Sequence, residues 1–374
     1  MRVILAGGGT GGHIYPAVTI AKEFLRRDPK TEILFVGGKR GLESVIIPKE
    51  GFQLVTLNLE GIPRKISPKI FKSVWLAGKG VQETFKIIKD FKPDLVIGTG
   101  GYVCGPMVLA ATFRGVATAI QEQNAFPGLT NRLLGKSVKR VFIAYPEAAK
   151  FFPASKIRVL GNPIRSEEFG AVSRIEAEKN LGLKPNHLNL LVFGGSQSAR
   201  RINQALLANL KKLLEKFPNL QIMLMTGEKE YDNINEVVNS MNLTADNLNR
   251  LKLVPYFYKI AEAYKASDLV LARAGAISLA EITCFGIPAM LVPYPYATNN
   301  HQMFNARVLE KNGAATVIPE KELTEDSLWE KLTLLLNDFK LREEMSKASL
   351  AIGKPEAVKM IVDELMTLKS GNRH

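Results

Sequence analysis

The fold is decided by the first thirteen residues, Met1-Arg-Val-Ile-Leu-Ala-Gly-Gly-Gly-Thr-Gly-Gly-His13. Val3 to Ala6 is an apolar run of the length that one buried strand needs. The glycine-rich segment Gly7 to Gly12 follows, and apolar residues at helical spacing begin after Pro16. A strand, a glycine turn and a helix open a doubly wound α/β domain, and such a turn points backbone N–H groups at an anion. A phosphate cradle does not need His13, so this histidine is a candidate for chemistry.

Length and composition predict a soluble protein of two domains. The chain has 374 residues, which is too many for one ordinary core, and 46% are hydrophobic and 23% charged. Its only cysteines, Cys104 and Cys284, are far apart in apolar contexts, which fits a reducing compartment and excludes a cysteine-rich zinc or disulfide framework. The four histidines show no metal-ligand spacing. No apolar run approaches the length of a membrane span, and no secretory signal is expected.

The positive charge is concentrated in the first half. Residues 1–165 hold 25 Lys and Arg against 11 Asp and Glu, whereas residues 166–374 hold 25 of each. Nucleic acid and an anionic membrane surface are the natural partners of such an excess. The segment 61–92 carries eight of these basic residues among apolar residues at helical spacing.

Two interpretations of this basic segment stay open. It is either an amphipathic helix that packs inward with a solvated basic face, or a surface that rests on an anionic bilayer. In the second case each Lys or Arg near the lipid contributes roughly 1 kcal/mol. Single-stranded nucleic acid is not expected, because the few aromatic residues make a poor stacking platform. The residues of the expected membrane face are Lys65, Lys69, Phe71, Lys72 and Trp75.

The opening pattern recurs further along the chain. A second glycine turn, 98–106, follows the apolar run 95–97, and a third, 194–199, follows the run 188–193. The chain therefore divides into two doubly wound halves, which we place at 1–163 and 164–350. Gly161 to Arg165 is the connection between them. A C-terminal helix at about 355–370 is a candidate to pack back on the first half.

The glycine turns do not indicate a dinucleotide oxidoreductase. The dinucleotide fingerprint needs an acidic residue at the end of the second strand, and that strand ends here in Val36-Gly-Gly-Lys39. No pair of carboxylates has convincing spacing for glycoside hydrolysis. A non-catalytic nucleotide-sugar binding module stays open on these residues alone.

Seven segments resemble, in order and over nearly the whole chain, the motifs of the MurG family of bacterial peptidoglycan glycosyltransferases, part of glycosyltransferase family 28. They are GGGTGGH at 7–13, GTGGYVCGP at 98–106, QEQNAFPGLTNR at 121–132, GNPIR at 161–165, GGSQSARRIN at 194–203, RAGAISLAE at 273–281 and HQMFNA at 301–306. The resemblance implies the GT-B fold, in which two Rossmann-like α/β domains face a central cleft. It also implies transfer of N-acetylglucosamine from UDP-N-acetylglucosamine to lipid I, with inversion at the anomeric carbon, to give lipid II.

The resemblance assigns roles residue by residue. It makes His13 the catalytic base near the acceptor hydroxyl, a role that an imidazole with a near-neutral pKa can fill. The second turn, with Gly100, Gly101 and Tyr102, is implied on the acceptor or phosphate side. The residues implied in binding UDP-N-acetylglucosamine are Thr10, Gly11, Gly12, Asn124, Arg165, Ser196, Phe257, Ala276, Ile277, Ser278, Leu279, Ala280, Glu281, Gln302 and Asn305.

Within that set, Ser196 is expected to hold a donor phosphate, Glu281 the ribose hydroxyls and Gln302 the sugar hydroxyls. One departure is Ser198, where the family motif usually has glycine. Its effect on the backbone of the third turn, and whether His301 contacts the donor, are left open.

The resemblance also implies partners and location. No metal ion or other cofactor is expected, since helix N-termini can hold a diphosphate. The implied partners are the donor, the undecaprenyl-linked acceptor and an anionic membrane, with other cell-wall synthesis proteins as further candidates. The implied location is peripheral, on the cytoplasmic face of the cell membrane. The alternative is another GT-B enzyme that uses a UDP-sugar, either a glycolipid glycosyltransferase or a UDP-N-acetylglucosamine epimerase.

Overall fold

A computed structural model describes residues 1–39, 41–57, 81–165, 169–170, 172–194 and 199–368. The chain forms two compact units, which we call unit 1 (Met1–Ile164 with Pro355–His374) and unit 2 (Arg165–Lys354). The sequence had placed the boundary at 163/164, and the contacts divide the chain at 164/165. The expected membrane-face residues and two serines of the third glycine turn lie outside the described residues: Lys65, Lys69, Phe71, Lys72, Trp75, Ser196 and Ser198.

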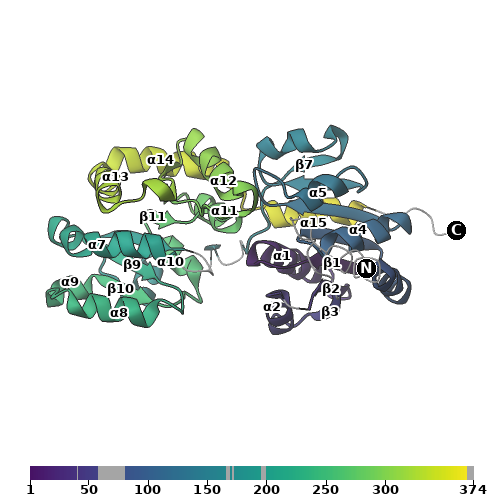
Figure 1. Ribbon diagram of the computed structural model, residues 1–374, viewed down its shortest axis with the longest axis horizontal. Helices are drawn as coiled ribbons and strands as arrows, with labels where there is room; N and C mark the ends of the chain where they lie inside the picture. The colour runs from purple at the N-terminus through teal and green to yellow at the C-terminus, as the bar shows by residue number, and fades with distance from the viewer. Residues whose placement is uncertain (40, 58–80, 166–168, 171, 195–198, 369–374) are drawn as a thin grey trace, which may run out of the picture. The chain divides into compact units, whose positions relative to one another are not determined.

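Unit 1 contains a seven-stranded parallel sheet with the order β3-β2-β1-β4-β5-β6-β7 (Figure 1). Its strands are β1 (Arg2–Gly7), β2 (Glu32–Gly38), β3 (Gln53–Leu57), β4 (Leu95–Gly100), β5 (Ala117–Glu122), β6 (Arg140–Ile143) and β7 (Ile157–Val159). Its helices are α1 (Gly11–Arg27), α2 (Glu43–Lys49), a helix at 81–91, α4 (Cys104–Phe113), α5 (Leu129–Leu134) and α15 (Ala357–Thr367). Short strands and helices alternate because neighbouring parallel strands need a crossover connection, and the central strands β4 and β5 are buried along their whole length.

Helices cover both faces of this sheet. On one face, α1 and α15 pack against alternate strand residues such as Val3 and Leu5, which are fully buried. On the other face, α4 and α5 pack against Ile4 and Ala6. The alternation of neighbouring residues between two apolar cores is what a buried strand with period two requires.

Unit 2 repeats the plan with a six-stranded parallel sheet, in the order β10-β9-β8-β11-β12-β13. Its strands are β8 (Leu188–Phe193), β9 (Leu220–Met225), β10 (Leu251–Val254), β11 (Leu269–Ala272), β12 (Ala289–Leu291) and β13 (Ala315–Val317). Its helices are α6 (Arg174–Leu181), α7 (Arg200–Lys216), α8 (Tyr231–Ser240), α9 (Ala245–Asn249), α10 (Ile260–Ala266), α11 (Ala276–Cys284), α12 (His301–Lys311), α13 (Glu325–Asn337) and α14 (Phe339–Ile352).

The strand order reverses once in each sheet, between β1 and β4 in unit 1 and between β8 and β11 in unit 2. Open α/β sheets bind ligands beyond the carboxyl ends of the strands at such a point. In unit 1 the register pairs Gly7 with Gly100, so the first and second glycine turns leave the sheet side by side. In unit 2 the corresponding strands are β8, which is followed by Gly194, and β11, which is followed by the turn at 273–275.

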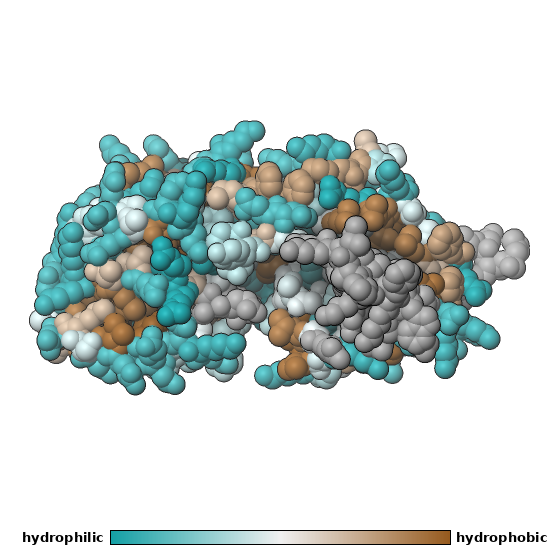
Figure 2. All heavy atoms as spheres, viewed as in Figure 1, coloured by the Kyte–Doolittle hydropathy of each residue, from teal (hydrophilic) through white to brown (hydrophobic). Residues whose placement is uncertain are grey.

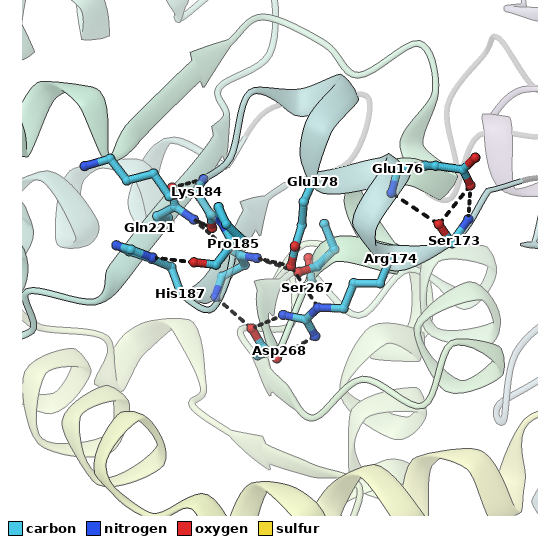
Figure 3. A network of polar contacts seen from close by, with 12 residues as sticks. Ser173, Arg174, Glu176, Glu178, Lys184, Pro185, His187, Gln221, Ser267 and Asp268 are labelled. Atoms are coloured by element: carbon cyan, nitrogen blue, oxygen red, sulfur yellow. Dashed lines mark hydrogen bonds and ion pairs between the residues drawn. The ribbon is translucent and has the colours of Figure 1, made fainter.

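At the amino ends of the unit 2 strands, opposite the carboxyl ends that carry the switch point, a polar network joins helix and sheet (Figure 3). Arg174 on α6 donates to both oxygens of Asp268, at 2.8 and 2.9 Å, and also to Glu178. Asp268 accepts a further bond from the backbone N–H of Asn189, at the start of β8. The network therefore ties α6 to the amino ends of β8 and β11 and lies away from the glycine turns.

No helix within the described residues is long and apolar enough to cross a membrane.

Candidate active site

The two glycine turns of unit 1 touch one another. A side-chain carbon at Gly101 would lie 2.5 Å from the backbone oxygen of Gly8, and Gly101 has a φ of +85°. Gly100, with a φ of +111°, lies against the His13 ring, and a side-chain carbon there would be 2.6 Å from His13 Nδ1. Both positions need glycine for its φ and for the close approach. The turns form one surface around His13.

Gln123 fixes the tautomer of neutral His13. The Gln123 Nε2 donates to the Thr99 carbonyl at 2.8 Å and to the Gln121 carbonyl at 3.2 Å, so the Gln123 Oε1 must face His13. This oxygen lies 3.2 Å from His13 Nδ1. Since a carbonyl oxygen only accepts, Nδ1 carries the proton and neutral His13 keeps its lone pair on Nε2. The imidazole is thus arranged as a proton acceptor.

Burial lowers the pKa of His13 below its ordinary value. Hydrogen bonds to Gln123 and to the Thr99 backbone and the negative charge of Glu43 act in the opposite direction, but burial is the larger effect. His13 is half-buried at the start of α1, and the Thr10 carbonyl accepts the His13 N–H at 3.0 Å. A base with a lowered pKa is neutral, and so able to take a proton, at neutral pH.

The polar segment after β5 is built around a second buried carboxylate. Glu122 accepts bonds from the backbone N–H groups of Asn124 and Gly128 and from the side chains of Asn124 and Asn131. Burial raises the pKa of Glu122, and these N–H donors oppose the rise. The predicted site residue Asn124 is therefore held at the carboxyl edge by Glu122.

The predicted nucleotide pocket of unit 2 lies at the start of α11. Half-buried Glu281 accepts a hydrogen bond from the Tyr264 hydroxyl at 3.1 Å. Tyr264 is 2% exposed and packs against the rings of Phe193 and Phe285. Burial and Glu281 raise the pKa of Tyr264 well above its ordinary value, so the hydroxyl stays a donor. This contact orients one oxygen of the carboxylate expected to hold the ribose.

Gln302 on α12 joins two strand ends of the same edge. Its Oε1 accepts the backbone N–H groups of Ala274 at 3.2 Å and Tyr294 at 2.9 Å. Both partners are donors, so the orientation of the amide is fixed and its NH₂ group points away from them. An NH₂ held in this way is suited to a sugar hydroxyl.

The other predicted residues differ in how a ligand could reach them. At the start of α1, Thr10 and Gly12 are exposed and Gly11 is half-buried. Leu279 and Phe257 have buried side chains and can offer only their backbones. The remaining positions of the pocket, Ala276, Ile277, Ser278 and Ala280, surround the first turn of α11.

Two polar residues of this neighbourhood brace the turn. Asn305 is fully buried and donates to the Ala274 carbonyl at 3.3 Å, which fits support of the turn better than contact with a sugar. Arg273 donates to the Val292 carbonyl at 3.0 Å and forms an ion pair with Glu320, so its charge is used within unit 2. Half-buried Arg165 stands at the first residue of unit 2.

Sequence reasoning missed three residues that the structure places at these sites: Glu43, Gln123 and Tyr264. Gln123 lies inside the motif 121–132, directly after β5, and a polar residue at the carboxyl end of a strand is a signal for a site residue. Tyr264 and Glu43 belong to no recognised motif, and their partners become neighbours only through tertiary packing.

Two Rossmann-like domains with glycine turns at the switch points of their sheets are typical of nucleotide-binding α/β proteins. Residues 3–143 match the family model described as the glycosyltransferase family 28 N-terminal domain, and residues 189–364 match that of the family 28 C-terminal domain.

Three known proteins illustrate the similarity. The UDP-N-acetylglucosamine–N-acetylmuramyl-(pentapeptide) pyrophosphoryl-undecaprenol N-acetylglucosamine transferase of Thermoanaerobacter sp. strain X514 is 44% identical over 96% of this chain and 98% of its own. The crystal structure of Acinetobacter baumannii MurG matches with a TM-score of 0.78 at 28% identity, covering 98% and 99% of the chains. The UDP-GlcNAc 2-epimerase of Neisseria meningitidis, at 15% identity, shares the fold with a TM-score of 0.67 over 98% and 100% of the chains.

The chain belongs to glycosyltransferase family 28 and has the GT-B fold.

Proposed function

We propose that the protein transfers N-acetylglucosamine from UDP-N-acetylglucosamine to the N-acetylmuramyl unit of lipid I, giving lipid II for peptidoglycan synthesis. The observation that carries this proposal is the 44% identity, over 96% of the chain, to a transferase named for that reaction. The sugar is attached at the 4-hydroxyl of the acceptor, with inversion at the anomeric carbon.

His13 acts as the base in this reaction. Its neutral Nε2 takes the proton of the acceptor hydroxyl, the oxygen attacks the anomeric carbon, and the bond to the diphosphate breaks so that UDP leaves with the electron pair. The fixed Nδ1–H···Gln123 contact supports this role, because it leaves Nε2 as the accepting atom. A positioned base of this kind typically contributes roughly 10²–10⁴-fold to the rate.

Unit 2 binds the donor. Glu281, oriented by Tyr264, accepts the ribose hydroxyls, and the Gln302 NH₂ donates to the sugar. The N-terminus of α11 holds the diphosphate through backbone N–H groups, without a metal ion. Support for this arrangement comes from the position of α11, which begins just after β11, one of the two strands at the switch point of the sheet.

The protein works at an anionic membrane surface, on its cytoplasmic side. Support comes from four exposed apolar residues on α4 and α5: Leu109, Phe113, Leu129 and Leu133. Figure 2 shows hydrophobic surface on unit 1. Exposed basic residues, Arg114 and Lys136, follow the two helices. An apolar patch with a basic rim is typical of interfacial binding.

A transfer assay tests the proposal. Radiolabelled UDP-N-acetylglucosamine and a lipid I analogue should give labelled lipid product, UDP-glucose should not replace the donor, and a chelator should leave the rate unchanged. Epimerisation of the donor sugar without transfer to the acceptor would support the epimerase alternative instead. A rate that requires added divalent metal would contradict the metal-free diphosphate site.

Replacing His13 tests the base. His13→Ala should lower kcat by roughly 10²–10⁴-fold, with the KM for the donor nearly unchanged, because unit 2 holds the donor. For the wild type, kcat should rise with pH through the lowered pKa of His13, below 6.5, and be flat above it. Full turnover by His13→Ala would rule out this assignment.

A further inference from the structure

Glu43 is a buried carboxylate without a role in the reaction described above. It is the first residue of α2 and is 1% exposed. Its Oε2 accepts the Gly9 N–H of the first glycine turn at 2.9 Å, and its Oε1 accepts the Gly38 N–H at the end of β2 at 2.8 Å. No described Lys, Arg or His forms an ion pair with it. The two backbone amides therefore bind the Glu43 carboxylate in the way that a glycine turn binds a ligand anion.

Three glycines form a cage around this carboxylate. A side-chain carbon at Gly37 would lie 2.6 Å from Glu43 Cγ, and one at Gly8 or Gly41 would collide with the carboxylate oxygens. Gly8, part of the turn that suggested a phosphate cradle, is therefore needed to leave space for Glu43. The Gly9 amide, which such a cradle would direct at a ligand phosphate, is already satisfied within the chain.

The Glu43 cage also contacts the second turn and lies close to His13. A side-chain carbon at Gly38 would collide with the Tyr102 hydroxyl, and Gly101 lies against Gly8. Burial and then the Glu43 charge raise the pKa of Tyr102. The same charge acts on His13, against the stronger effect of burial.

We propose that Glu43 is a positioning residue for the transfer reaction: as an internal anion it fixes the first glycine turn and stabilises the positive charge that His13 acquires. This inference rests on the proposed function, since it needs His13 to take the acceptor's proton. In that step the acceptor O–H bond breaks, an N–H bond forms at Nε2, and neutral imidazole becomes imidazolium. A negative charge that is already in place nearby lowers the free energy of the imidazolium, and no group has to reorient during the reaction.

Other titratable groups around His13 do not supply this charge. Tyr102 and Cys104 stand on the second turn, and burial raises the pKa of Tyr102 and raises that of Cys104 to about 12, so both are neutral at neutral pH. Glu122 stands at the end of β5 with four N–H donors, and its titration is common to the wild type and to variants at Glu43. Glu43 is the carboxylate whose charge acts on His13.

The test compares Glu43→Gln with the wild type in the transfer assay over a range of pH, after the wild type has been shown to transfer sugar. Removing the charge should lower kcat about tenfold or more and leave the KM for UDP-N-acetylglucosamine within about twofold. The acid limb of the kcat profile should move to lower pH by at least about half a unit, because imidazolium loses its stabilising neighbour. A structural role alone would not move this limb.

Two further variants make the test specific. Glu43→Asp keeps the charge but shortens the reach, so kcat should fall while the acid limb stays at its wild-type pH. Glu50→Gln removes an equal charge from the residue that follows α2, where it faces Lys22 on the surface, and should change neither quantity. If Glu43→Gln does not fold, the Glu43→Asp result decides, and wild-type kcat in that variant overturns the proposal.

Two results with Glu43→Gln overturn the proposal. The first is a wild-type kcat and profile. The second is a loss of kcat with an unmoved acid limb, which assigns Glu43 to folding alone. A wild type that transfers no sugar would instead contradict the proposed function and is seen before any variant is compared.

Discussion

One amide decides which nitrogen of His13 can act. Gln123 is buried, and its NH₂ is directed at backbone carbonyls, so only its oxygen is left for the imidazole. The tautomer that the proposed base needs is thereby set by the main-chain oxygens of Thr99 and Gln121. The same logic holds in unit 2, where main-chain N–H groups orient the Gln302 amide. In both units, the backbone beyond the carboxyl ends of the strands orients side chains of the proposed site.

Tyr264 should contribute to donor binding through Glu281. Tyr264→Phe removes the hydroxyl that bonds Glu281 but keeps the ring between Phe193 and Phe285. The loss of one bond to a carboxylate, about 1–1.5 kcal/mol, should raise the KM for UDP-N-acetylglucosamine about five- to tenfold with kcat nearly unchanged. Steady-state kinetics would check this, with Tyr231→Phe on α8 as the control. An unchanged KM would remove Tyr264 from the donor site.

At the scale of elements, the glycine turns obtain their geometry from strand order. β1 and β4 are neighbours in the sheet although more than eighty residues of chain separate them, so two turns distant in sequence leave the sheet together. α1 and α4 then start from adjacent points and cover opposite faces. The carboxyl edge at this switch point is therefore lined by two helix starts at once, and His13 is on one of them.

The α4 and α5 pair should provide membrane affinity. Replacing Leu109, Phe113, Leu129 and Leu133 together by Ser should lower binding to anionic vesicles about tenfold or more, because these side chains are the proposed apolar contact with the lipid. Since the four side chains are 39–80% exposed, the replacement should change the stability of the fold little. Co-sedimentation would measure this, and salt should weaken the binding of the wild type. Ile175→Ser with Leu334→Ser, exposed apolar residues of unit 2, is the control. Equal loss in the control would contradict a specific patch.

For the whole molecule, the sequence predicted the elements that repeat and missed the contacts that join them. Apolar runs with glycine turns identified β1, β4 and β8 and the fold, because buried parallel strands leave a strong local pattern. Three-residue strands such as β13 leave almost none. The same difference holds for the candidate site. His13 and Glu281 lie in recognisable sequence motifs, whereas the role of Glu43 depends on the backbone amides of Gly9 and Gly38, which contact it only in the folded chain.

The C-terminal helix should be essential to unit 1. Ile361, Val362 and Leu365 on α15 are fully buried in the core that contains α1, and Arg27 pairs with Asp363. Leu365→Ala should destabilise unit 1 by about 2–5 kcal/mol, whereas the neighbouring exposed Met366→Ala should cost about 0.5 kcal/mol or less. Hydrogen exchange in α1 would report the difference. Equal protection in both variants would show that α15 is dispensable.

The return of α15 to unit 1 has a consequence for how the protein is made. Residues 1–164 are synthesised before the rest of the chain, yet the core of unit 1 lacks α15 until residues 357–367 emerge from the ribosome. Residues 165–354 are complete earlier, so the unit encoded second is the first that can be finished during synthesis. Throughout that interval the apolar side chains of α1 that pack with α15 in the folded protein are uncovered in the nascent chain, and chaperones can bind them. Loss of residues 357–367 would therefore impair the fold of the unit that contains the first 164 residues.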